Sequence, residues 1–190
     1  MKIHSECLNT LEIINSFHND LKIAKKLVYD KCGFDLTDTN LHTESTAYGA
    51  CSFQLNGKTI QHRISKITPT KTGQFVTLWK RNKDGITEPF DFSDNIDFII
   101  ITARSADNFG QFIFPIAVLA DKGIITRNGK EGKRGIRVYP PWDIATNKQA
   151  EKTQNWQIEY FITIKTDILF DLDWIKQLFT KIEMANGEMS

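Results

Sequence analysis

Cysteine and histidine are scarce in this sequence, and neither is arranged as a metal site. The 190 residues include three cysteines and four histidines. Cys7, Cys32 and Cys51 are odd in number and far apart, with no Cys-x-x-Cys pair. This spacing argues against the common zinc modules and against a disulfide-stapled secreted scaffold. We therefore expect a reducing compartment and no bound metal or cofactor.

Long apolar runs and nucleotide-binding loops are also absent. No segment approaches the roughly 20 consecutive apolar residues that cross a bilayer, and the N-terminus lacks the apolar core of a secretion signal. Neither a GxxxxGK[ST] loop nor a GxGxxG motif occurs, and no serine or cysteine has a nucleophile-elbow context. We expect a cytoplasmic protein that has no membrane partner and no nucleotide-driven reaction.

The composition is that of an ordinary globular protein. Hydrophobic residues make up 41% of the chain and charged residues 25%. The length suits a single domain spanning residues 1–190. A formal net charge of only +1 excludes a simple polybasic binder. Any electrostatic attraction must therefore come from separation of the two signs of charge along the chain.

Basic residues are concentrated in two stretches of the sequence. The first, from Lys58 to Arg81, contains six lysines and arginines and no carboxylate. The second, from Gly129 to Trp142, has Glu131 as its single acid among four basic residues. The first stretch is followed by an acidic run of Asp84, Glu88, Asp91, Asp94 and Asp97. This segregation favours a surface that binds a polyanion.

Helices are predicted near both ends of the chain. Apolar residues recur at three- and four-residue steps from Ser5 to Lys31, with a break near His18, and again from Leu172 to Ile182. Good helix formers predict a further helix over Asp143–Asn155, and a short one is expected over Ile116–Asp121.

Strands are predicted through the middle of the chain. Asn56-Gly57 separates the segments Tyr48–Leu55 and Thr59–Ile64 and suits a type I′ hairpin turn. Phe98–Ile101 is rich in β-branched residues, as in strands buried on both faces. Other strands are expected at Phe75–Lys80, Gln111–Pro115, Ile124–Thr126, Ile136–Tyr139 and Trp156–Ile164, and a loop or a short helical turn at Asp35–Thr46. The fold class is therefore α+β, with a central, mostly antiparallel mixed sheet flanked by N- and C-terminal helices.

Several segments between Tyr48 and Trp156 resemble the MepB-like family. They are YGACSF at 48–53, KITPTK at 66–71, GQFVTLWKR at 73–81, PFD at 89–91, GQFIFP at 110–115, GKRGIRVYPPW at 132–142, and QA with KTQ within 149–154. The resemblance covers most of the chain between the predicted terminal helices. It implies nucleic-acid binding and a core like that of restriction endonucleases, but no particular reaction.

The first basic stretch contains candidate phosphate contacts. Lys66, Lys71, Lys80 and Arg81 each offer a positive charge to a phosphate. Thr68 and Thr70 add hydroxyl donors between the first two lysines. The alternative is an exposed strand edge whose lysines discourage pairing with another sheet.

The second stretch offers a tighter loop. Glycines around Lys133 and Arg134 allow guanidinium and backbone N–H groups to meet one anion, and Arg137 follows on the next predicted strand. Tyr139 and Trp142, on either side of two prolines, are candidates for stacking on a base. The alternative is an aromatic cluster that seals the end of the sheet.

The predicted helix after Asp143 carries two further candidates. Gln149 and Lys152 are three residues apart and so share one face of a helix. Glutamine pairs with adenine edges, and lysine binds phosphate or guanine. A solvated helix face would have the same sequence.

A metal-dependent nuclease is the enzyme alternative. Nucleases of the restriction-enzyme type hold Mg²⁺ with an Asp at a strand start and an acid or Gln on the next strand, and use a Lys two residues further on. Asp97 and Gln111 occupy such positions, but Ile113 stands where the lysine is needed. Glu44 is a further candidate carboxylate, and Lys133 is a substitute for the lysine.

The sequence thus leads to one expected function and two alternatives. We expect binding of DNA or a nucleotide-like polyanion through a basic groove, without intact catalysis. The alternatives are a metal-dependent phosphodiesterase or nuclease and a protein-interaction or ligand-sensing module. The groove hypothesis requires Lys66, Lys71, Arg134 and Arg137 to line one groove, with Asp97 at its floor.

Overall fold

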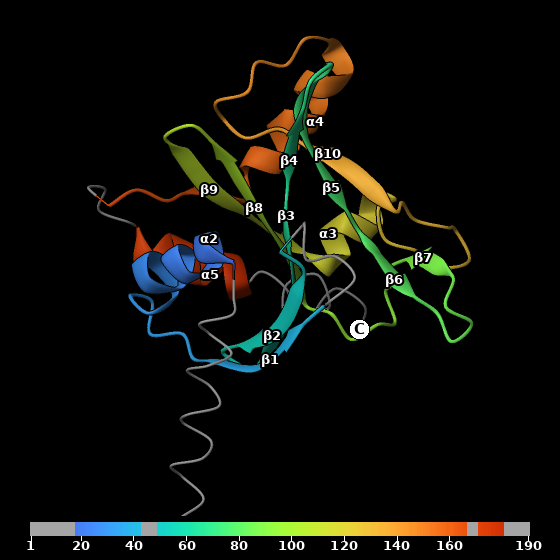
Figure 1. Cartoon of the computed structure of the whole chain (residues 1–190), viewed down its shortest axis with the longest axis horizontal. Helices are drawn as coiled ribbons and strands as arrows, with labels where there is room; N and C mark the ends of the chain where they lie inside the picture. Colours follow the sequence, from blue (N-terminus) through green and yellow to red (C-terminus); the bar gives the residue numbers. More distant parts are fainter. Residues whose placement is uncertain (1–17, 43–48, 167–170, 181–190) are drawn as a thin grey trace, which may run out of the picture.

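A six-stranded mixed sheet lies at the centre of the computed structural model, which describes residues 18–42, 49–166 and 171–180 (Figure 1). The strand order is β1-β2-β3-β8-β9-β11. Their bounds are β1 (Leu36–Leu41), β2 (Cys51–Leu55), β3 (Lys58–Ile64), β8 (Phe98–Ser105), β9 (Asn108–Pro115) and β11 (Phe161–Thr163). β3 and β8 are parallel, and the other neighbouring pairs are antiparallel. The predicted α+β class with a mostly antiparallel mixed sheet is confirmed.

Each face of the central sheet is covered by its own layer (Figure 1). One face packs on α2 (Asn19–Ala24), the π-helix η1 (Lys25–Tyr29) and α5 (Leu172–Thr180), so the helices near the two chain ends share it. The other face packs on a second sheet with the order β10-β5-β4 and on two helices. These elements are β4 (Lys66–Thr68), β5 (Lys71–Thr77), β10 (Gly135–Val138), α3 (Ile116–Asp121) and α4 (Lys148–Ile158). None of the described helices is long and apolar enough to span a membrane.

β8 is buried on both faces, as its sequence predicts. Ile100 packs in the core beneath the helices, whereas Ile99 and Ile101 pack in the core beneath the second sheet. Successive strand residues point to opposite faces, so a strand between two layers must be apolar throughout. The predicted hairpin is also confirmed, because Asn56 and Gly57 have φ values of 51° and 76° and connect β2 to β3.

β1 is the clearest departure from the sequence prediction. A loop or a short helical turn is expected over Asp35–Thr46, but Leu36–Leu41 forms the first strand of the central sheet. Only Leu36 in this strand is buried, because an edge strand can leave most of its side chains in solvent. Its register shifts between Thr37 and Asn40, where Asp38 has a positive φ of 49°. The segment therefore lacks the apolar alternation that identifies a strand in a sequence.

The boundaries around α4 also differ from the prediction. The helix begins at Lys148, after the N-cap Asn147, and continues to Ile158 rather than ending at Asn155. The predicted strand Trp156–Ile164 is consequently reduced to Phe161–Thr163. The predicted strand Ile124–Thr126 makes only an isolated bridge from Thr126 to Asp91. The parts of the predicted elements at 5–17, 48 and 181–182 lie outside the described residues.

A chain of buried hydrogen bonds crosses the helix-side core. The Tyr29 hydroxyl donates to Gln111 Oε1 at 2.6 Å, and Gln111 Nε2 donates to Thr102 Oγ1 at 2.9 Å. His62 Nδ1 lies 3.0 Å from the Gly49 carbonyl oxygen, which only accepts, so this nitrogen carries the proton. His62 Nε2 therefore accepts from the Thr102 hydroxyl at 2.9 Å. This series of hydrogen bonds joins η1, β9, β8 and β3, and His62 is neutral in it.

The side chain of Gln157 attaches α4 to the edge of the second sheet. Its Nε2 donates to the Arg137 carbonyl oxygen at 3.1 Å, and its Oε1 accepts from the Tyr139 N–H at 2.8 Å. The amide thus replaces the strand that would otherwise pair with this part of β10. Gln157 is 1% exposed, so the backbone groups have no easy access to water in its place.

We expect acid to destabilise the protein through His62. Burial lowers the His62 pKa from 6.5 to about 4, so the unfolded state takes up a proton before the folded state does. The contribution of His62 to the free energy of unfolding is therefore fully present above pH 6.5. The free energy falls by up to about 3 kcal/mol as the pH drops to 4. Urea unfolding at several pH values measures this slope. His62→Gln, which does not titrate, should flatten it, and an unchanged slope in that variant would contradict the assignment.

We also expect Gln157→Met to lower the free energy of unfolding by about 2–4 kcal/mol, because it leaves two backbone groups without partners. The matched control is Gln149→Met on the same helix, whose exposed side chain should change stability by less than about 0.5 kcal/mol. Equal losses in the two variants, measured by chemical denaturation, would show that the Gln157 amide does not hold α4 in place.

Candidate anion-binding pocket

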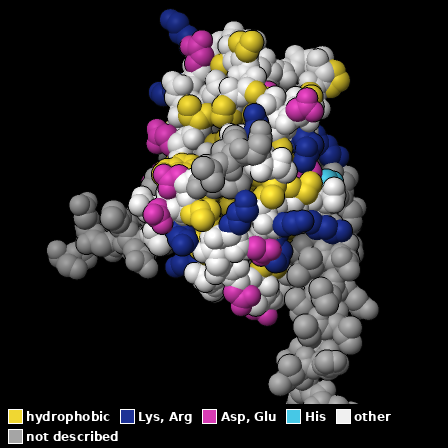
Figure 2. Space-filling model, turned by 90° about the vertical axis from the view of Figure 1, so that its left-hand side faces the viewer, with side chains coloured by type: hydrophobic (Ala, Val, Ile, Leu, Met, Phe, Trp, Pro, Cys, Tyr) yellow, Lys and Arg dark blue, Asp and Glu magenta, His cyan; other side chains and the backbone are white. Residues whose placement is uncertain are grey.

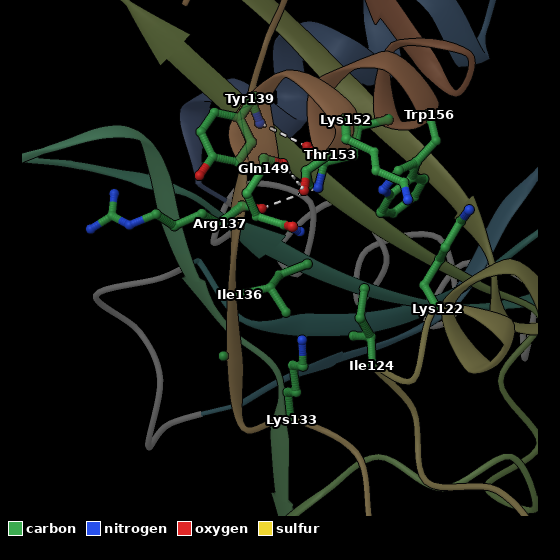
Figure 3. Close-up of a pocket in the computed structure, with 12 residues that line it drawn as sticks. Lys122, Ile124, Lys133, Ile136, Arg137, Tyr139, Gln149, Lys152, Thr153 and Trp156 are labelled. Atoms are coloured by element: carbon green, nitrogen blue, oxygen red, sulfur yellow. Dashed lines mark hydrogen bonds between the residues drawn. The ribbon is translucent and has the colours of Figure 1, made fainter. Parts of the chain in front are cut away.

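A basic pocket lies between the end of α3, the start of β10 and α4 (Figure 3). Its volume is about 370 Å³. It is lined by Lys122, Ile124, Lys133, Gly135, Ile136, Arg137, Tyr139, Gln149, Lys152, Thr153, Trp156 and Gln157, and no Asp or Glu is among them. We call this set the basic pocket. Its size is within the range of small-ligand sites.

Three lysines from separate elements supply the positive charge of the basic pocket. Lys122 is the C-cap of α3, Lys133 precedes β10 and Lys152 belongs to α4. Within the described parts of the chain, none of the three forms an ion pair with a carboxylate. The Lys122 amine lies 5.3 Å from the centre of the Trp156 ring, a cation–π contact. Their charge is therefore not neutralised by the described protein.

The floor of the pocket is apolar. Ile124 and Ile136 are 5% and 9% exposed, and the partly buried Trp156 ring lies against the same core. Three lysine side chains around an apolar, partly aromatic floor suit a ligand that has both an anionic group and a flat ring.

A close backbone approach fixes the position of Lys133. A Cβ on Gly132 would lie 2.4 Å from the Ile124 carbonyl oxygen, so only glycine fits. The Gly132 N–H donates to Thr126 Oγ1, and the Lys133 N–H donates to the Ile124 carbonyl oxygen. These backbone N–H groups are therefore occupied. Neither of the two is available to an anion.

Five of the residues singled out in the sequence meet at the basic pocket, and they are Lys133, Arg137, Tyr139, Gln149 and Lys152. Sequence reasoning missed Lys122 and Trp156. Trp156 follows Lys152 by four residues, so helical spacing places both on one face. That signal was hidden because the predicted helix stops at Asn155.

Arg137 contributes its backbone and stem to the pocket more than its charge. Its guanidinium points away from the three lysines (Figure 3). It donates to Thr68 Oγ1 at 2.7 Å and to the Gly73 carbonyl oxygen at 2.9 Å. Weaker bonds reach the carbonyl oxygens of Lys71 and Thr72. The arginine thus holds the β4–β5 hairpin, which carries the candidates Lys66, Thr68, Thr70 and Lys71.

The two aromatic candidates pack against the protein. A Cβ on Gly73 would lie 2.6 Å from the Tyr139 ring, so this ring rests on the β5 backbone. Trp142 meets the Phe161 ring edge-on at 5.4 Å between centres. For Trp142 this geometry matches the alternative of an aromatic cluster at the end of the sheet.

The remaining basic candidates lie away from the pocket, around the hairpin of β6 (Trp79–Arg81) and β7 (Thr87–Pro89). Lys80 pairs with Asp94 and, at 3.4 Å, with Glu88. Arg81 donates to the Gly85 carbonyl oxygen at 2.5 Å. Arg134 pairs with Glu131 at 2.8 Å and donates to the Thr87 carbonyl oxygen. Of the four residues of the groove hypothesis, Lys66 and Lys71 belong to the β4–β5 hairpin, which Arg137 contacts, whereas Arg134 contacts the β6–β7 hairpin instead.

Asp97 and Gln111 do not form a shared site. Gln111 pairs with Thr102 in the sheet, five residues beyond Asp97 along β8, which corresponds to about 16 Å. Gln111 is fully buried in the hydrogen-bond chain, whereas Asp97 accepts from the Thr59 N–H at 2.8 Å. The two cannot ligate one cation. Glu44 lies outside the described residues.

Basic side chains also occur on the opposite side of the molecule. Figure 2 shows the face of α2 and α5, where Lys and Arg side chains gather along one side next to exposed hydrophobic groups. Lys22, Lys25 and Lys26 belong to α2 and η1, and Lys25 pairs with Asp30 at 2.6 Å. The central sheet separates this face from the basic pocket.

Comparison with known proteins identifies the family of the chain. A family model described as MepB-like matches residues 42–163, which include both basic stretches and the basic pocket. A crystal structure of MepB is 34% identical, with a TM-score of 0.66, and the match covers 70% of this chain and 89% of that one. No curated protein matches the sequence. The chain belongs to the MepB-like family, whose function is uncharacterised.

Proposed function

We propose that this protein binds a nucleotide-like anion, either free or as an unpaired nucleotide of a nucleic acid, in the basic pocket. The observation that carries the proposal is the meeting of Lys122, Lys133 and Lys152 around an apolar floor with no carboxylate in the lining. A phosphate is neutralised by the lysines, and a base lies against the Trp156 ring.

The size of the pocket favours an unpaired nucleotide over duplex DNA. A base inside a duplex is stacked between its neighbours, whereas a base in a single strand can enter a pocket beside its phosphate. The β4–β5 hairpin, with Lys66 and Lys71, extends from the same layer and offers further contacts to an adjoining phosphate. The nuclease alternative gains no support from Asp97 and Gln111, because Asp97 precedes β8 whereas Gln111, on β9, pairs with Thr102 five residues further along.

A labelled single-stranded oligonucleotide tests the proposal. Each neutralised phosphate contributes about −0.7 to the slope of log affinity against log salt, so the one phosphate in the pocket predicts a slope of at least this size. Replacing Lys133 or Lys152 by Gln should weaken binding about tenfold and make the slope shallower. Fluorescence anisotropy over a series of salt concentrations measures both quantities.

The matched controls are Lys58→Gln and Arg134→Gln. Lys58 begins β3 and does not line the pocket, and Arg134 is already paired with Glu131. Both variants should bind within about twofold of the unmodified protein. Losses as large as those of the pocket lysines would indicate a diffuse charge effect. Absence of binding at low salt, to the oligonucleotide and to a free nucleotide alike, would refute the proposal.

A further inference from the structure

Arg63 is a buried charge without a counter-ion among the described residues. Its side chain projects from β3, and the residue is 3% exposed. The guanidinium donates one hydrogen bond, from NH1 to the His62 carbonyl oxygen at 2.8 Å, and lies 5.5 Å from the centre of the Phe90 ring. Within residues 18–42, 49–166 and 171–180, no carboxylate lies within 4 Å of it.

This arrangement lowers the stability of the protein when no anion is bound. Burial lowers the Arg63 pKa to about 10, so the side chain is still charged at neutral pH. A buried ion without a partner loses its hydration and gains no Coulomb energy in return. One backbone carbonyl and one aromatic ring leave most of its N–H groups unused. The site is therefore suited to an anion supplied from elsewhere.

The strand register places other polar groups beside Arg63. Continuing the pairing of Leu41 with Cys51 and of Cys51 with His62 aligns His42, Ala50 and Arg63 in one row across three strands. Ser52 lies on the same face, with its Oγ 3.2 Å from His42 Nε2. Burial and, secondly, the charge of Arg63 lower the His42 pKa.

A second polar group that lacks a hydrogen-bond partner lies on the same face of β3. Gln61 is two residues before Arg63, and its Oε1 is buried with no hydrogen-bond donor. His42 and Ser52 are half-buried, and the row of His42, Ala50 and Arg63 ends next to β1, the first strand in the sheet order. The polar groups thus extend from Arg63 to this edge of the sheet.

We propose that Arg63 is the anion receptor of a second binding site, separate from the basic pocket, which takes the phosphate group of a small ligand with Ser52 and His42 as further donors. A phosphate accepts hydrogen bonds from several directions, and the planar guanidinium binds two of its oxygens at once. Arg63 points from the central sheet toward the second sheet and the Phe90 ring, and it does not line the basic pocket.

Thermal unfolding in phosphate and in chloride, at equal pH and ionic strength, tests this site. Inorganic phosphate at about fifty times its dissociation constant should raise the unfolding midpoint of the unmodified protein by about 5 °C. Arg63→Met should reduce this shift to the part that the basic pocket supplies. In chloride the same variant should be at least as stable as the unmodified protein, because an apolar side chain replaces an unpaired buried charge. Arg63→Lys retains the charge without the planar fork and should show a reduced shift.

Two further variants distinguish this site from phosphate binding in the basic pocket and from an internal ion pair. Lys133→Gln should lose only the part of the phosphate shift that belongs to the basic pocket, and complete loss of the shift in that variant would assign the phosphate to the basic pocket and overturn the proposal. Glu44→Gln tests whether the chain neutralises Arg63 itself. If Glu44→Gln and Arg63→Met each destabilise the protein in chloride, and the double variant is no worse than either, an internal ion pair replaces the proposed ligand. A phosphate shift as large in Arg63→Met as in the unmodified protein would also overturn the proposal.

Discussion

The pairing of β8 with β3 and β9 is the constraint on which the rest of the molecule depends. β8 lies in the interior of the central sheet, and its side chains from Phe98 to Ala103 are fully buried. Both covering layers must therefore supply apolar side chains to it. The helices near the chain ends do so on one face, and the second sheet with α3 and α4 does so on the other. The basic pocket forms at the rim of that second layer.

Polar anchors, not hydrophobic packing alone, set the shape of the pocket. The Gln157 amide ties α4 to β10, and the close approach at Gly132 ties the Lys133 backbone to Ile124. Arg137 holds the β4–β5 hairpin in a similar way. Several residues that look like ligand contacts in a sequence are thus occupied within the protein. The lysines of the pocket extend from walls that these hydrogen bonds and close contacts hold in place.

Sequence patterns predicted the helices, strands and turns that are determined by neighbouring residues in the chain. The Asn56-Gly57 turn, the apolar β8 run and the short helix at Ile116–Asp121 each depend on a few adjacent residues. The position of Lys122 beside Trp156 depends on how α3 and α4 pack, and no spacing in the sequence reports it. The pairing of Arg137 with a hairpin more than sixty residues away is hidden for the same reason. Counting charges along the sequence identified the basic stretches. It could not identify which of their side chains form ion pairs or hydrogen bonds within the protein.

The irregular edge strand β1 has a consequence for how the protein behaves at high concentration. An open sheet edge offers unpaired N–H and C=O groups that another chain can extend into a larger sheet. The register shift at Asp38, with its left-handed backbone, interrupts that row of groups, and exposed polar side chains surround it. A second molecule cannot continue the ladder past this point. The polar sequence of β1, which prevents its prediction as a strand, therefore also protects the sheet against aggregation.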